Sequence, residues 1–146
     1  MGLIASLKAG IEKIKNIFIT DEIATASMIM AAWVTAADGE IKESEIEETE
    51  NFIKEADEFK DLDKKPLTKL YRKWCDKFIK DPEDAVVHAL MEIHPLKDKP
   101  EGISALHVAV KIARSDGDFC EAEQKVVTRA CHYLGVDAEK IKNYHE

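Results

Sequence analysis

Two short acidic stretches of this chain carry residues that could bind a metal ion. Residues 36–45 read AADGEIKESE, and residues 114–123, 78 positions later, read RSDGDFCEAE. Each stretch offers three carboxylates within eight residues, which are Asp38, Glu40 and Glu45 in the first and Asp116, Asp118 and Glu123 in the second. Carboxylate oxygens are preferred ligands of hard divalent cations. The repeated phrase therefore predicts a divalent-cation site (Ca²⁺, Mg²⁺, Mn²⁺ or Zn²⁺), and its spacing does not identify the ion.

The phrase matches only half of a calcium-binding EF-hand loop. In the first stretch, loop positions 5, 6, 8 and 12 hold Asp38, Gly39, Ile41 and Glu45, and the second stretch repeats this match. Loop positions 1 and 3 hold Val34 and Ala36 in one copy, and Ile112 and Arg114 in the other. None of these four residues supplies a ligand suited to calcium, so the sequence excludes two independent EF-hands.

A purely structural role explains nearly all of the same residues. Gly39 and Gly117 would allow the backbone to turn at the end of a helix. The apolar Ile41 and Phe119 would anchor each turn to the core, and a second set of acids would complement the positive start of the next helix, namely Glu43, Glu45, Glu121 and Glu123. This alternative does not require an Asp before Gly and an acid after it in both copies. Metal binding and helix capping both remain open.

Helical periodicity covers almost the whole chain, which predicts an all-α fold. The sequence predicts helices near 3–18, 22–37, 43–58, 66–80, 82–94, 101–114, 121–134 and 138–144. The segments 22–37 and 101–114 are apolar around much of their circumference, which is typical of helices at the centre of a bundle. The acidic phrase follows each of these two segments. It therefore lies twice at a junction between helices.

The two halves indicate an internal duplication within one domain. The chain of 146 residues is predicted to form a single helical domain over 1–146, of about seven to eight helices in two halves related by a pseudo-two-fold axis. Residues 22–58 form the first predicted repeat and residues 101–135 the second. Residues 1–20 form a predicted amphipathic N-terminal helix, which packs on its own domain or lies on a membrane or partner.

Net charge and cysteine content narrow the classes of partner. A net charge of −8 argues against nucleic acid, whose phosphates must be neutralised by Lys and Arg, and favours metal cations or basic protein surfaces. The charge is also segregated, because residues 38–63 carry −9 and residues 64–80 carry +6. Three widely spaced cysteines without a CxxC pair indicate a reducing compartment, so we expect a cytoplasmic protein, peripheral at the inner membrane if the N-terminal helix binds lipid.

No pattern typical of an enzyme stands out. Cys75 and Cys131 lie on apolar stripes, and Cys120 lies among acids that would raise the pKa of its thiol. His88 and Glu92 do not form the HExxH arrangement of zinc proteases, and neither a glycine-rich phosphate loop nor a GxSxG turn occurs in the sequence. The sequence therefore predicts a non-enzymatic protein without catalytic residues.

The two phrases TAADGEIKESEIE and ARSDGDFCEAEQKVV, each at the end of an apolar helix, resemble the tellurite-resistance TerB family. The related N-terminal domain of some membrane-anchored DnaJ-like co-chaperones is similar. The resemblance covers residues 22 to 135 and implies an all-α fold of about seven helices in two halves. It implies a cytoplasmic protein with protein partners in a metal-stress or membrane-linked complex, acting as a scaffold or as a cation-binding module. The acidic surface carried over from the family falls on Asp38, Glu45, Asp116 and Glu123, supported by Glu40, Glu43, Asp118 and Glu121.

Overall fold

The computed structural model describes residues 19–116 and 119–142, apart from the side chains of Asp116, Lys140 and Lys142. Within these residues the chain forms helices joined by 3₁₀ turns, and no strand occurs. The α-helices are α2 (Asp21–Thr35), α3 (Glu43–Glu55), α4 (Lys64–Lys80), α5 (Pro82–Ile93), α6 (Pro100–Ala113), α7 (Glu121–Leu134) and α8 (Ala138–Lys142). The 3₁₀ turns are η1 (Ala36–Asp38), η2 (Asp57–Phe59), η3 (His94–Leu96) and η4 (Arg114–Asp116). The predicted all-α fold class is confirmed.

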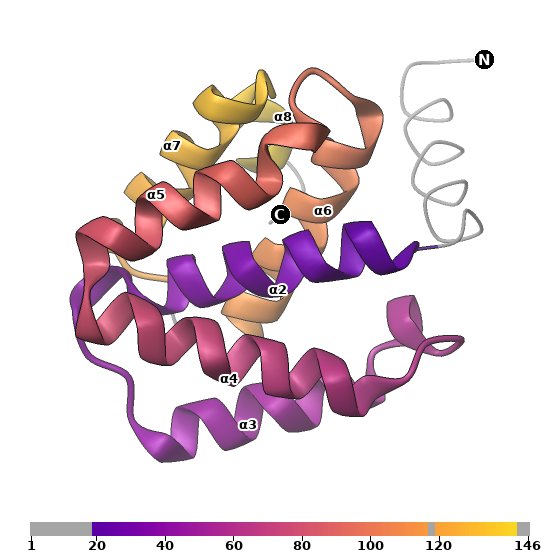
Figure 1. Cartoon of the computed structure of the whole chain (residues 1–146), viewed down its shortest axis with the longest axis vertical. Coiled ribbons are helices and arrows are strands. Elements are labelled where there is room, and N and C mark those ends of the chain that lie inside the picture. The colour runs from indigo at the N-terminus through magenta and orange to yellow at the C-terminus, as the bar shows by residue number, and fades with distance from the viewer. Residues whose placement is uncertain (1–18, 117–118, 143–146) are drawn as a thin grey trace.

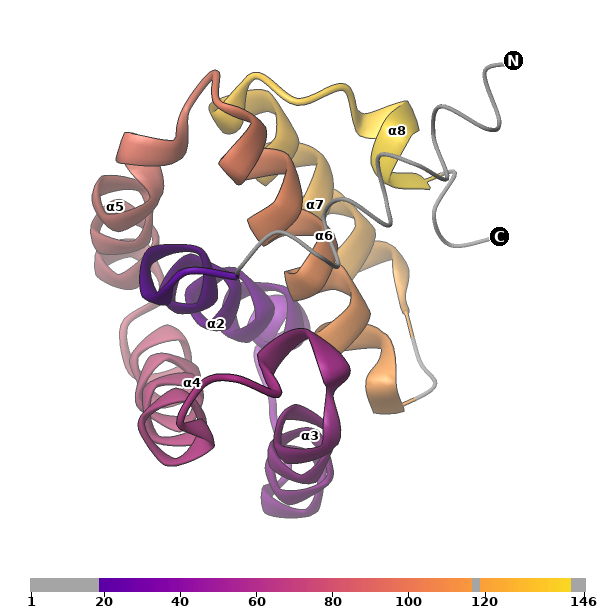
Figure 2. The ribbon, with the colours of Figure 1, turned by 90° about the vertical axis from the view of Figure 1, so that its right-hand side faces the viewer.

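Helices α2 and α6 form the centre of the molecule, as their apolar sequences predicted. Figure 2 looks along α2, which is surrounded by α4, α5, α6 and α7, with α3 below (Figures 1 and 2). Small residues let α2 and α6 approach closely. Ser27 of α2 is fully buried, and its hydroxyl lies 2.8 Å from the carbonyl oxygen of Ile23 and 3.1 Å from that of Ala105 in α6. The central helix pair is therefore joined by a hydrogen bond as well as by packing.

Helix α4 packs against α2 through a buried polar chain and aromatic contacts. The Tyr71 hydroxyl donates a hydrogen bond of 3.1 Å to Thr35, whose own hydroxyl donates one of 2.8 Å to the carbonyl oxygen of Ala31. Trp33 of α2 stacks on Phe78 of α4, with ring centroids 6.3 Å apart. These contacts fix the rotation of α4 about its axis, so that its lysines face away from the core.

The same order of elements occurs twice, 78 residues apart. Helix α2 leads through η1 to α3, and α6 leads through η4 to α7. The contacts between the two sets are reciprocal, because α3 packs against η4 and α7 packs against η1. Each junction is therefore supported by a helix from the other half of the chain, as a pseudo-two-fold arrangement requires.

Several predicted helix ends agree with the structure and two differ. Helix α5 begins at the predicted residue 82, where Asp81 caps it by accepting a hydrogen bond from the backbone N–H of Asp84 and Pro82 occupies the first turn. Helix α3 ends at Glu55 rather than near residue 58, because Ala56 adopts an extended conformation. Helix α4 begins at Lys64 rather than near residue 66, because Asp63 caps it. Pro66 therefore lies in the first turn, where a backbone N–H would have no partner in the helix and its absence costs little.

No helix among the described residues is long and apolar enough to cross a membrane. The predicted amphipathic helix over residues 1–20 lies, but for its last two residues, outside the described part of the chain.

Candidate functional site

The first acidic junction is held by local hydrogen bonds. Asp38 is exposed, and its carboxylate accepts a hydrogen bond of 3.1 Å from the backbone N–H of Glu40. Gly39 adopts a left-handed backbone conformation with a φ of 87°, which residues that carry a Cβ rarely adopt. Ile41 is partly buried against the core. The Asp-Gly pair therefore makes the turn that separates α2 from α3.

The second junction uses its last acid to start α7. Glu123 is buried, with 8% of its surface exposed, and its carboxylate accepts a hydrogen bond of 3.0 Å from the backbone N–H of Cys120. This contact satisfies one of the N–H groups that a helix start leaves without a partner. Phe119 is partly buried against the core, as the sequence predicted. Glu123 therefore has a defined capping role.

The described parts of the two junctions do not form a cation site. Among the residues that the structure describes, no group of three His, Cys, Asp or Glu side chains lies close enough to hold a metal ion. Asp38 and Glu40 are exposed, Glu45 is partly buried at the start of α3, and Glu123 is engaged as a cap. The side chain of Asp116 and all of Asp118 lie outside the described residues. The divalent-cation site stays a prediction that depends on these two residues.

A clamp of ion pairs joins α3 to α4 beside the first junction. The guanidinium of Arg72 in α4 lies 2.7 Å from a carboxylate oxygen of Glu43 and 2.7 Å from one of Glu50, both in α3. Its Nε donates a further hydrogen bond of 3.3 Å to Glu50, so the contact with Glu50 is bidentate. Hydrogen bonds to Glu50 and then Glu43 raise the pKa of Arg72 above its usual value. The clamp holds the two helices at a fixed separation.

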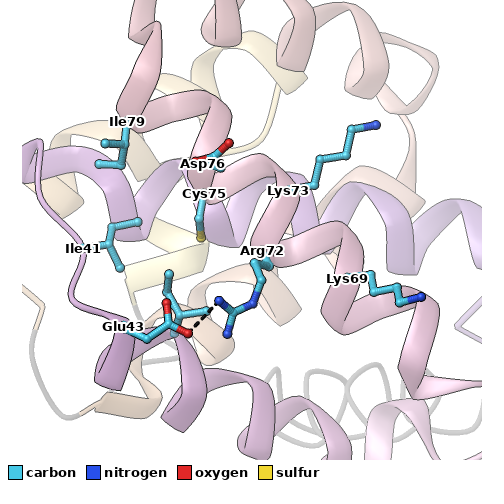
Figure 3. Close-up of a pocket in the computed structure, with 9 residues that line it drawn as sticks. Ile41, Glu43, Lys69, Arg72, Lys73, Cys75, Asp76 and Ile79 are labelled. Carbon is cyan, nitrogen blue, oxygen red and sulfur yellow. Dashed lines mark hydrogen bonds and ion pairs between the residues drawn. The ribbon is translucent and has the colours of Figure 1, made fainter.

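This separation leaves a groove of about 540 Å³ between the start of α3 and the outer face of α4. Its apolar residues come from both walls, with Ile41 on the chain leading into α3 and Ile79 on α4 (Figure 3). Ile46 of α3 also lines the groove. Ile79 is 39% exposed. Lys69 and Lys73 line the same groove and extend outward from α4 (Figure 3). The groove thus combines an apolar surface with a basic rim.

The three cysteines are poor candidates for a nucleophile. Burial raises the pKa of Cys75 to about 12 and that of Cys131 to about 11. At Cys120 a hydrogen bond with the Glu123 backbone lowers the pKa, but desolvation and the Glu123 carboxylate outweigh it, so the pKa is raised overall. A thiol reacts as its thiolate, and all three environments disfavour that form near neutral pH.

The groove is the feature that the sequence interpretation did not identify. The acidic phrases predict a site at the two turns, whereas the groove residues come from α4 and from the residues around the start of α3. The segregated charge was the signal for this region: residues 64–80 have a net charge of +6, and residues 38–63 have one of −9. The two oppositely charged segments meet in the clamp of Arg72 with Glu43 and Glu50. The remaining lysines of α4 were not assigned to a site.

Comparison with known protein families gives one match that covers most of the chain. A family model described as "Tellurite resistance protein TerB" matches residues 24–145, which include both acidic junctions and the groove. Comparisons with curated proteins and with solved structures found no match. The family match agrees with the resemblance carried by the two acidic phrases. The chain therefore belongs to the TerB family of tellurite-resistance proteins.

Proposed function

We propose that this protein is a non-enzymatic binding module of the tellurite-resistance system, which works as a scaffold by holding a protein partner in the groove between α3 and α4. The observation that carries this proposal is the groove itself, which has one exposed and two partly buried isoleucines and lies beside the ion pairs that join α3 to α4. Binding surfaces that are held in place before the partner arrives lose less conformational entropy on association.

Two features of the chemistry support a binding role over catalysis. The raised pKa of each thiol disfavours nucleophilic or reductive chemistry at cysteine. In the first junction, Glu43 and Glu45 lie in the first turn of α3, where they complement the partial positive charge of the backbone, and Asp38 accepts a hydrogen bond within the turn itself. These acids therefore have a structural use that needs no metal ion.

Photocrosslinking in the host cell tests the proposal. A photoreactive phenylalanine analogue would replace Ile46 in the groove, and a matched variant would carry it at Val87, which is 56% exposed on α5. Illumination during tellurite exposure should give a discrete protein adduct from position 46 and none from position 87. Equal adducts from both positions, or no adduct from position 46, would contradict a binding role for the groove.

Cation binding by the acidic junctions is the competing function, and a thermal measurement distinguishes it from partner binding without a metal ion. Melting temperature would be measured after EDTA and then with Ca²⁺, Mg²⁺, Mn²⁺ and Zn²⁺ in turn, on wild type and on Asp38→Asn/Asp116→Asn. If the junctions bind no metal ion, none of the four ions should change the melting temperature of either protein. An ion present at 100 times its dissociation constant would instead add about 2.7 kcal/mol to the wild type alone, which is a rise of several degrees.

A further inference from the structure

We infer that the partner segment held in the groove is an acidic amphipathic peptide, whose carboxylates pair with Lys69 and Lys73 and whose apolar side chains pack on Ile46 and Ile79. This inference rests on the proposed function and specifies the partner of the same site. It follows from which charges around the groove are already paired within the protein and which are not.

The two acids that line the groove each lie in an intramolecular ion pair. Glu43 lies 2.7 Å from Arg72, and Asp76 lies 3.1 Å from Lys80, one helical turn further along α4. Because Arg72 also holds Glu50, its charge is fully used by the clamp. Glu43, Asp76 and Arg72 are thus all engaged in ion pairs within the protein.

Lys69 and Lys73 are the charges that remain. Within the residues that the structure describes, no carboxylate pairs with either ammonium group, and both side chains are exposed. They continue a row that begins at Lys65, and the spacing of four residues places all three on one face of α4. Like charges at this spacing repel one another and lower the stability of a helix. A bound anionic group would relieve this repulsion.

The position of the lysines beside apolar residues identifies the chemical class of the ligand. Lysine alone would suit any anion, but Ile46 and Ile79 lie in the same groove and favour a ligand with apolar side chains. A peptide helix with Asp or Glu on one side and Leu, Ile or Phe on the other meets both requirements. Its charge also complements the +6 of residues 64–80 in a chain whose net charge is −8.

The test is a selection of binders from a displayed library of random 16-residue peptides. The targets are wild type, Lys69→Glu/Lys73→Glu, and the matched control Lys97→Glu/Lys99→Glu in the loop before α6, which changes the net charge by the same amount. A protein of net charge −8 would select basic peptides if overall charge decided binding. Enrichment of peptides rich in Asp and Glu with apolar residues at helical spacing is therefore the expected and informative result.

The strongest selected peptide would then be titrated by fluorescence anisotropy. Lys69→Glu/Lys73→Glu and Ile79→Ala should each weaken its binding, the charge reversal by about tenfold or more, while Lys97→Glu/Lys99→Glu leaves it nearly unchanged. Selection of no peptide, selection of peptides without acidic enrichment, or an equal loss in both charge-reversed variants would overturn the inference. Vesicles containing anionic lipid form a second arm, and binding of these vesicles through Lys69 and Lys73 in place of peptide would also overturn it.

Failure of this inference is distinguishable from failure of the proposed function. A crosslinked adduct at position 46 together with no preference for acidic peptides would keep the groove as a binding site and reject the acidic class of partner. Absence of the adduct would reject the groove itself.

Discussion

Ser27 and Ala105 lie 78 positions apart in the sequence, and the Ser27 hydroxyl donates a hydrogen bond of 3.1 Å to the Ala105 carbonyl oxygen. The interval of 78 residues also separates the two acidic phrases, so the bond joins positions that the predicted repeat makes equivalent. Contact between equivalent positions is expected where two related helices cross on a pseudo-two-fold axis. The crossing of α2 and α6 is thus the point around which the two junctions are arranged.

Substitutions at Ser27 should separate the contribution of this hydrogen bond from that of close packing. Ser27→Ala removes a donor but leaves both carbonyl acceptors within their helices, so we expect a loss of about 0.5 to 1.5 kcal/mol in the free energy of unfolding. Ser27→Leu must force the fully buried crossing apart and should cost more, by at least 1 to 3 kcal/mol. Urea unfolding followed by circular dichroism measures both, and equal losses would show that the crossing is not tightly packed.

Two glycines with a positive φ should differ in their tolerance of alanine. At Gly39 a Cβ would meet no atom within 4 Å, so Gly39→Ala should cost only backbone strain, about 1 to 2 kcal/mol. At Gly135, with a φ of 73°, a Cβ would also collide with the carboxylate of Asp98, so Gly135→Ala should cost more. Thermal unfolding would compare the two variants.

A second variant identifies the source of the extra cost at Gly135. Asp98 itself has a φ of 60°, so Asp98→Gly keeps the backbone and removes the carboxylate. In that background Gly135→Ala should cost no more than Gly39→Ala does in wild type. A cost that stays equally high with Asp98→Gly would exclude the collision as its cause.

The clamp at Arg72 should contribute a modest amount of stability that depends on salt. Its side chain is 41% exposed, so solvent screens its ion pairs, and Arg72→Gln should lower the free energy of unfolding by about 0.5 to 1.5 kcal/mol at low salt. At 1 M NaCl the screening length is about 3 Å, and the difference from wild type should shrink. Lys80→Gln is the matched control, since its pair with Asp76 is more exposed and should be worth about 0.5 kcal/mol or less. A loss for Arg72→Gln that is insensitive to salt would point to packing of its stem instead.

The buried thiol of Cys75 should make the protein less stable at alkaline pH. Burial raises its pKa to about 12, above the ordinary value of 9.0 that it regains on unfolding. Between these values the unfolded chain has lost the proton while the folded chain keeps it, so the contribution is complete below about pH 9 and is lost as pH rises toward 12. The expected loss is about 1.4 kcal/mol for each pH unit in this window. Urea unfolding at pH 8 and pH 10.5 measures it, and Cys75→Ala, which lacks the thiol, should show a smaller decrease. Identical decreases would assign the effect to other groups.

Local rules predicted the helices, and long-range pairing produced the groove. The ends of α5 and α7 could be predicted because Asp81, Pro82 and Gly135 act on their own helix through neighbouring backbone groups. The groove needs Glu43 and Arg72 to meet across 29 positions, and only the packing of α3 and α4 on the same side of the core brings them together. Glu123 illustrates the same limit, because the phrase made it a candidate ligand while its burial and its bond to Cys120 show a capping role.

The reciprocal packing of the two halves has a consequence for the order in which the protein folds during synthesis. Helix α2 ends at Thr35, but its main partner α6 ends at Ala113, 78 residues later. At synthesis rates of about 5 to 20 residues per second, the face of α2 that packs on α6 is exposed for about 4 to 16 seconds before α6 is complete. An apolar helix face exposed for that time is a ready substrate for chaperones, and the core cannot be completed before α6 and α7 have left the ribosome. Contacts of such long range also make folding slower than is usual for a helical bundle of this size.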